Sequence, residues 1–257
     1  MPVQETVDIF HRGQFVLVQP KGAGHRSGID AMMLAAAVPD DFKGRLADLG
    51  AGAGAAGLAV AARCADANVV LVEIDPAMTA YTAKTLKHES NQSLAPRVSC
   101  LESDVTLTGK PRADSGLADN SFDFAIMNPP FNAAHDRRTP DLAKVNAHVM
   151  SEGLFEAWLR TASAIVRPGG GVALIARPQS IGDILAALKG RFGTVKILPV
   201  HPRANEPAIR IIATGIKGSR AGLTLEPPHV LHGAVGNAFL PRAEAINNGE
   251  ACLFDPA

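Results

Sequence analysis

The sequence has little cysteine and no excess charge of either sign. Only Cys64, Cys100 and Cys252 occur in 257 residues, and no two of them form a CxxC pair. This usage excludes a disulfide framework and a cysteine metal site, and we expect a protein of the reducing cytoplasm. Lys and Arg total 25, as do Asp and Glu, so no overall positive field attracts nucleic acid. An anionic partner must therefore be held by local basic patches.

Long apolar runs and paired histidines are also missing. No stretch reaches the roughly 18 uninterrupted apolar residues of a membrane span, and the first fifteen residues contain no apolar signal core. The eight histidines show neither HxxH nor HExxH spacing. We therefore expect no membrane partner and no metal, whereas the oligomeric state stays open.

What the sequence does have is a regular alternation of strand-like and helix-like segments. Because 47% of the residues are hydrophobic, the chain can bury one large core. Strands are predicted at 45–49, 69–73, 97–101, 122–127, 172–176, 194–200 and 208–215. Helices are predicted at 29–38, 55–64, 76–89, 151–166 and 179–188. This order predicts an α/β fold, a Rossmann-like doubly wound and mostly parallel seven-stranded sheet that ends in a β-hairpin.

We expect one domain over residues 1–257. Its parts would be an N-terminal extension at 1–40 that covers the ligand site, a Rossmann-like core at 41–220, and an irregular C-terminal tail at 221–257. The Pro168-Gly169-Gly170 turn is expected to end the helix before the fifth strand.

A glycine-rich turn follows the first predicted strand of the core. From Asp48 to Gly57 the sequence reads DLGAGAGAAG, which contains a literal GxGxxG at Gly52, Gly54 and Gly57. Glycines at a strand-to-helix turn let the backbone approach a ligand, either a dinucleotide pyrophosphate or an amino-acid carboxylate. The turn alone leaves both ligands open, and an NAD-dependent oxidoreductase is the alternative from another class.

Carboxylates at the ends of three strands favour the second ligand. Glu73 ends its strand where an acid accepts hydrogen bonds from ribose hydroxyls in either ligand family. Asp48 lies under the glycine turn, where its charge would repel a pyrophosphate but suit a cationic amino group or sulfonium. Asp104 follows the third strand and can accept from an adenine amino group.

These residues resemble the cofactor motifs of class I S-adenosylmethionine methyltransferases. The resemblance implies that Asp48 and the glycine turn lie near the methionine moiety, that Glu73 binds the ribose, and that Asp104 borders the adenine. It also implies that the Arg26 to Asp30 segment closes over the methionine end, although an ordinary helix start explains that segment equally well. The expected cofactor-binding residues are Arg26, Asp30, Asp48, Gly50, Ala51, Gly52, Gly54, Glu73, Ile74, Asp104, Val105 and Asn128.

The fourth core strand runs directly into Asn128-Pro129-Pro130-Phe131. An exocyclic amino nitrogen is a poor nucleophile because its lone pair is delocalised. The Asn128 side-chain oxygen and the Pro129 carbonyl can accept both amino protons and stabilise the developing positive charge. The two prolines stiffen the loop, and Phe131 offers a face on which a base can stack. We expect Asn128, Pro129, Pro130 and Phe131 to be catalytic.

Over most of its length the chain is similar to the bacterial tRNA adenine-N6 methyltransferase family that modifies a valine tRNA. The similarity includes RSGIDAMMLAAAVP near the start, NPPF and its following loop, and IKGSR near the end. It implies methyl transfer to N6 of adenine in tRNA. The NPPF motif also occurs in enzymes for guanine in rRNA and glutamine amides, and a small-molecule acceptor is a further alternative.

Local basic residues are compatible with an RNA partner. The candidates lie on the segment after NPPF, a plausible substrate-covering lid, and after the last predicted strand. Each cluster also fits an ordinary solvated loop. The expected substrate-binding residues are His135, Arg137, Arg138, His148, Lys217 and Arg220.

Overall fold

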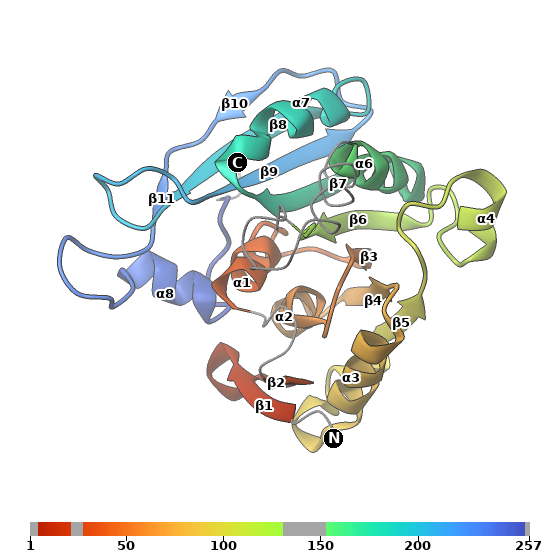
Figure 1. Cartoon of the computed structure of the whole chain (residues 1–257), viewed down its shortest axis with the longest axis horizontal. Coiled ribbons are helices and arrows are strands. Elements are labelled where there is room, and N and C mark those ends of the chain that lie inside the picture. The colour runs from red at the N-terminus through yellow and green to blue at the C-terminus, as the bar shows by residue number, and fades with distance from the viewer. Residues whose placement is uncertain (1–4, 22–27, 131–152, 255–257) are drawn as a thin grey trace, which may run out of the picture.

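A nine-stranded sheet forms the centre of the molecule in the computed structural model (Figure 1). The structure describes residues 5–21, 28–130 and 153–254. The strand order is β10-β8-β9-β7-β6-β3-β4-β5, and β11 pairs separately with β8. The strands are β3 (Gly44–Leu49), β4 (Ala67–Glu73), β5 (Val98–Glu102), β6 (Phe122–Met127), β7 (Val166–Ala176), β8 (Phe192–His201), β9 (Arg210–Lys217), β10 (Thr224–Leu225) and β11 (His229–Val230).

The strand directions confirm the predicted fold class. β5, β4, β3, β6 and β7 are mutually parallel neighbours. β9 lies antiparallel between β7 and β8, although it follows both of them in the sequence. All seven predicted strands are present, and β8 with β9 is the predicted terminal hairpin. In parallel sheets of this kind the ligand site lies at the carboxyl ends of the strands.

Helices cover both faces of this sheet, with α1 and α2 on one side and α6 and α7 on the other (Figure 1). Side chains along a strand point to opposite faces of the sheet. Leu46 belongs to the core cluster that includes α1 and α2, whereas Leu49 belongs to the cluster that includes α6 and α7. The helices are α1 (Ile29–Ala36), α2 (Ala55–Arg63), α3 (Pro76–Lys87), α4 (Gly109–Asp114), α6 (Leu154–Ile165), α7 (Ile181–Leu188) and α8 (Pro241–Asn247).

Local sequence explains where the helices nearest the site begin. α3 starts after Asp75, whose carboxylate accepts from the Ala77 N–H at 2.8 Å, and Pro76 occupies the first turn. α2 starts at Gly54, which has a left-handed φ of 94°. The alanine-rich face of α2 is almost fully buried, because small side chains let the helix approach the sheet closely. Both helices therefore begin at the carboxyl edge of the sheet.

Three features depart from the sequence predictions. The N-terminal extension contains an antiparallel pair, β1 (Glu5–Phe10) and β2 (Phe15–Pro20), where no strand was expected. The tail after Ala221 is not irregular throughout, since β10, β11 and α8 lie within it. β7 begins at Val166, before the Pro168-Gly169-Gly170 segment, and its pairing with β6 shifts register across that segment, where Gly169 has a left-handed φ of 79°. Short or irregularly paired segments have little hydrophobic periodicity in their sequence, so the sequence pattern does not predict them.

Candidate functional site

A cavity of about 730 Å³ opens at the carboxyl ends of β3, β4, β5 and β6. It is also lined by the first turn of α1, by two residues of α6 and by the start of β9. The structure brings together at this cavity most of the residues expected from the sequence to bind cofactor or act in catalysis. These are Asp30, Asp48, Gly50, Ala51, Gly52, Glu73, Ile74, Asp104, Val105, Asn128, Pro129 and Pro130. The turn between β3 and α2 forms the floor of the cavity.

That turn requires glycine at its first position. Gly50 has a φ of 70°, and its N–H and the Ala51 N–H both donate to the Val72 carbonyl, at 2.8 and 3.0 Å. A Cβ on Gly50 would lie 2.4 Å from the Trp158 ring. Gly54 does not line the cavity, but its left-handed backbone turns the chain into α2. Gly50 thus lets the backbone pack closely on the Trp158 ring at the cavity wall.

Asp48 is buried directly beneath the turn, with only 2% of its surface exposed. Its Oδ2 accepts the Gly57 N–H at 2.8 Å. Burial raises the pKa of this carboxyl to about 7, the Gly57 hydrogen bond opposes that rise, and nearby Glu73 adds to it. A cation placed beside Asp48 would favour its charged form.

Glu73 and Asp104 are held by backbone N–H groups rather than by cations. Glu73 accepts from Gly52 through Oε2 at 2.7 Å, and from Ile74 and Asp75 through Oε1 at 2.9 Å each. Asp104 Oδ1 accepts from the Thr106 N–H and hydroxyl, both at 2.7 Å. These bonds fix the orientation of two acceptors that face the same cavity.

Asn128 presents a different situation at the end of β6. Its Oδ1 is buried and has no hydrogen-bond donor among the residues that the structure describes. A buried amide oxygen without a partner costs free energy, about 1 to 3 kcal/mol. Because the residue lines the cavity, a ligand that brings an N–H group to this oxygen would recover that cost. Pro129 is buried beside it, and Pro130 is exposed at the rim.

The remaining expected residues fall into two groups. Arg26, Phe131, His135, Arg137, Arg138 and His148 lie outside the described residues. Lys217 and Arg220 are described, but β9 is antiparallel to its neighbour β7, so its end lies at the opposite edge of the sheet. Lys217 there donates to Asn120 and to the Val166 carbonyl at the start of β7. These two basic residues therefore face away from the cavity.

Two lining residues could not be inferred from the sequence. Arg210, at the start of β9, donates through Nε to Asp30 Oδ2 at 2.8 Å. The antiparallel insertion of β9 brings it to the cavity, and no local motif signals that insertion. Trp158, in α6, is 8% exposed and both packs in the core and lines the cavity.

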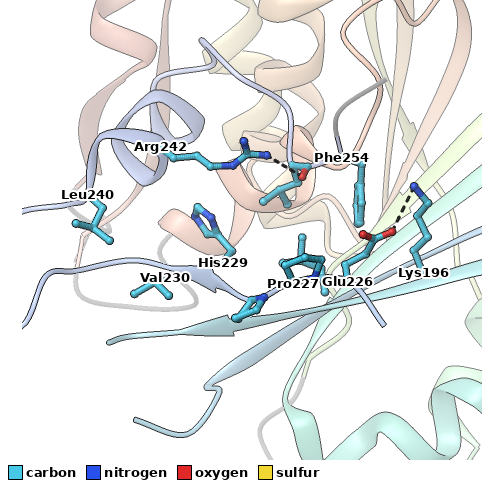
Figure 2. Close-up of a pocket in the computed structure, with 11 residues that line it drawn as sticks. Lys196, Glu226, Pro227, His229, Val230, Leu240, Arg242 and Phe254 are labelled. Carbon is cyan, nitrogen blue, oxygen red and sulfur yellow. Dashed lines mark hydrogen bonds and ion pairs between the residues drawn. The ribbon is translucent and has the colours of Figure 1, made fainter. Parts of the chain in front are cut away.

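A second cavity, of about 520 Å³, lies between β8 and the C-terminal tail (Figure 2). Its charged groups are engaged with other protein groups. Lys196 pairs with Glu226 at 3.4 Å, and Arg242 donates to the Leu253 carbonyl at 3.2 Å. Nε2 of His229, buried alongside, has no hydrogen-bond partner among the described residues, and burial lowers the pKa of its imidazole. This cavity includes none of the residues predicted from the sequence.

The described part of the chain contains no cluster of three or more His, Cys, Asp or Glu residues able to hold a metal ion. Within the same residues, every helix is too short or too polar to cross a bilayer.

The geometry of the first cavity fits S-adenosylmethionine. Glu73 and Asp104 offer acceptors for hydroxyl and amino groups, and Asp48 offers a negative charge beneath the glycine turn. The family model "Methyltransferase small domain" matches residues 23–202. The chain belongs to this family and is an S-adenosylmethionine-dependent methyltransferase. This result decides between the two ligands that the glycine turn alone left open.

Named relatives fall within the same class. A tRNA1(Val) (adenine(37)-N6)-methyltransferase of Pedobacter heparinus is 28% identical over 79% of this chain and 82% of its own length. A Porphyromonas gingivalis protein of the same name is 28% identical over 69% and 68%. The crystal structure of a predicted O-methyltransferase from Agrobacterium tumefaciens is 45% identical over 87% and 97%, with a TM-score of 0.76.

The fold is shared more widely. A T. thermophilus 16S rRNA N2 methyltransferase, solved with AdoMet and guanosine, has a TM-score of 0.55 at 23% identity. The match covers 83% of this chain and 50% of that one.

Proposed function

We propose that this methyltransferase acts on an exocyclic amino nitrogen, N6 of adenine in tRNA. The observation that carries the proposal is the buried Oδ1 of Asn128, a cavity-lining residue, which has no hydrogen-bond donor within the described part of the chain. An amino group has two protons to donate, and the Pro129 carbonyl follows Asn128 directly in the chain. A hydroxyl acceptor has only one proton and would leave one of these oxygens unpaired.

In this mechanism the chain supplies alignment and charge stabilisation. S-adenosylmethionine supplies a methyl group activated by its positively charged sulfur. Asn128 Oδ1 and the Pro129 carbonyl accept the two amino protons, so that the nitrogen lone pair points along the line of attack. The same two oxygens would stabilise the positive charge that the amino nitrogen gains on methylation, and the amino group would then lose one proton to solvent. No side chain needs to remove that proton in advance.

The cofactor roles follow from the positions around the cavity. Glu73 binds the ribose hydroxyls, and Asp104 with Val105 and Ile74 borders the adenine. Asp48 and the Gly50–Gly54 turn lie by the methionine moiety. These assignments are supported by the acceptor geometry described above. Phe131 would stack on the acceptor base and complete the catalytic set with Asn128, Pro129 and Pro130.

The relatives named for adenine-N6 transfer to tRNA favour RNA over the other amino acceptors. His135, Arg137, Arg138 and His148 follow the catalytic motif in sequence and are the proposed contacts to the RNA backbone. Guanine in rRNA, a protein glutamine amide or a small molecule would use the same pair of acceptors.

The test is transfer of a radiolabelled methyl group to tRNA, rRNA and total protein from cells that lack the gene. Label in tRNA that digests to N6-methyladenosine supports the proposal. Label in rRNA or protein keeps the amino chemistry but rejects the substrate. Label on a hydroxyl oxygen of any acceptor would reject the role given to Asn128. Asn205→Ala, at an exposed asparagine outside the cavity, is the matched control for Asn128→Ala.

A further inference from the structure

The second cavity, between β8 and the C-terminal tail, has the size and the walls of a small-molecule site (Figure 2). Its volume of about 520 Å³ lies within the roughly 300 to 1,000 Å³ that is usual for ligand pockets. Such pockets combine apolar walls with a few polar groups that orient the ligand. The apolar walls are formed by Leu198, Val230, Leu240, Leu253 and Phe254, and none of these residues lines the cofactor cavity.

His229 is the polar group of this cavity whose hydrogen bonding is incomplete. Only 5% of its surface is exposed, and Nε2 has no hydrogen-bond partner among the described residues. Its ring projects from β11 toward Arg242 (Figure 2). Burial and then the charge of Arg242 lower the pKa of the imidazole, so the ring is mostly neutral at pH 7. A ligand that pairs with Nε2 would recover the free energy lost by burying this nitrogen without a partner.

The charged groups of the same cavity already have protein partners. Lys196 lies 3.4 Å from Glu226, and its Nζ lies 5.4 Å from the centre of the Phe254 ring. Arg242 donates to the Leu253 carbonyl at 3.2 Å. A charged ligand would compete with these contacts and would itself have to be desolvated. A neutral ligand leaves the contacts in place.

We propose that this cavity binds a small uncharged aromatic molecule of the phenol class. The aromatic ring of the ligand packs on the apolar walls, which include the ring of Phe254. Its hydroxyl group pairs with Nε2 of His229, and because a hydroxyl both donates and accepts, it fits either tautomer of the neutral imidazole. The site is separate from the methyl-transfer cavity, so the proposal does not depend on the identity of the methyl acceptor.

NMR titration of the methyl signals tests the proposal, with saturating S-adenosylhomocysteine present so that the cofactor cavity is filled. The probes are p-cresol, toluene, which lacks the hydroxyl group, and benzoate, which is charged. We expect p-cresol to bind with a dissociation constant of about 1 mM and to shift the signals of Val230, Leu240 and Leu253. Toluene should bind about 3- to 10-fold more weakly, the range for one hydrogen bond, and benzoate should bind more weakly than p-cresol.

Variants of His229 then test its role through the ratio of the p-cresol and toluene affinities. His229→Phe should bring this ratio to about one, and His229→Leu should do the same, so the test does not depend on one variant folding. His229→Gln keeps a donor and an acceptor and should retain part of the preference. His88→Phe, outside both cavities, is the control and should leave the ratio unchanged.

Three results would overturn the proposal. The first is equal affinity of the wild-type protein for p-cresol and toluene, or tighter binding of benzoate. The second is an unchanged ratio in both apolar variants of His229. The third is the absence of saturable shifts at Val230, Leu240 and Leu253. A negative methyl-transfer assay would leave these binding results unaffected.

Discussion

The β4–β5 end of the cavity and the β6 end satisfy their polar groups in opposite ways. Glu73 and Asp104 each accept hydrogen bonds from nearby backbone N–H groups before any ligand arrives. Asn128 Oδ1, directly after β6, is buried and has no donor among the described residues. The first end is therefore preorganised for a ligand that binds in every cycle. Under the proposed function, the second end would be completed only by the reacting amino group, and this difference would separate cofactor binding from chemistry.

Deletion of the Asn128 side-chain oxygen should have the largest effect on methyl transfer. We predict that Asn128→Ala lowers kcat by about 10² to 10³, the loss expected when one preorganised group that stabilises developing charge is deleted. The dissociation constant for S-adenosylhomocysteine should change by less than about threefold. Single-turnover methyl transfer and calorimetry measure the two quantities. A variant with unchanged turnover would reject the role of Asn128.

A change at Glu73 should affect cofactor binding rather than the rate of methyl transfer. Glu73→Gln replaces one carboxylate oxygen with an NH₂ group, which faces backbone donors instead of accepting from them. We predict cofactor binding weaker by about 10- to 100-fold, with the rate at saturating cofactor nearly unchanged. Glu102→Gln is the control, since Glu102 is the exposed register partner of Glu73 outside the cavity. A large kcat effect without a binding effect would contradict the division between the two ends.

The packing beneath the glycine turn can be tested at Gly57, which does not line the cavity. A Cβ on Gly57 would lie 2.3 Å from Leu71 Cδ2 and 3.1 Å from Asp48 Oδ2. We predict that Gly57→Ala lowers the free energy of unfolding by about 1 to 3 kcal/mol through overpacking, measured by urea denaturation. Gly182→Ala in α7 is the control, because no atom lies within 4 Å of its added Cβ. Equal stability of the two variants would show that the turn relaxes.

The smallest predicted effect concerns the charge of Asp48. With a pKa of about 7, Asp48 is partly protonated at neutral pH in the free protein. A cationic cofactor favours the charged form, so its affinity should rise as the pH increases through 7, by about tenfold per pH unit at most below that value. Asp48→Asn should remove this pH dependence. Titrations at pH 6 and pH 8 measure it.

Stability of the free protein gives an independent check with the opposite sign. Because the folded pKa of Asp48 lies above the ordinary 3.8, the folded state loses stability as the pH rises from about 4 to about 7. His11 acts in the same window. Burial, and to a smaller extent Arg63, lower the pKa of His11 to about 4. The folded state therefore loses stability as the pH falls from 6.5 to about 4. The difference between wild type and Asp48→Asn isolates the aspartate.

The core of the fold and the cofactor side of the site could be predicted because their signals are local. Strand, glycine turn and terminal acid follow one another within ten residues at Asp48, and the parallel order of strands then brings Glu73 and Asp104 to the same edge. Asn128 could be found for the same reason, since β6 carries it to that edge beside β3.

The remaining features depend on long-range pairing. Nothing near Arg210 shows that β9 inserts beside β7 and so meets Asp30. The same reversal places Lys217 at the far edge, although its basic neighbourhood resembles an RNA contact. The β1–β2 pair was missed because β2 is buried on both faces and lacks alternation, and its backbone is satisfied partly by Asn91 and Thr85.

The placement of β9 also has a consequence for the order of assembly during synthesis. The strand that begins with Arg210 must enter between β7 and β8 after both have been made. The cavity wall is therefore incomplete until residue 210 has left the ribosome. A ligand stabilises only the state that binds it, so a nascent chain gains no full stabilisation from the cofactor before this late insertion. Folding of the parallel core must accordingly proceed on its own packing energy.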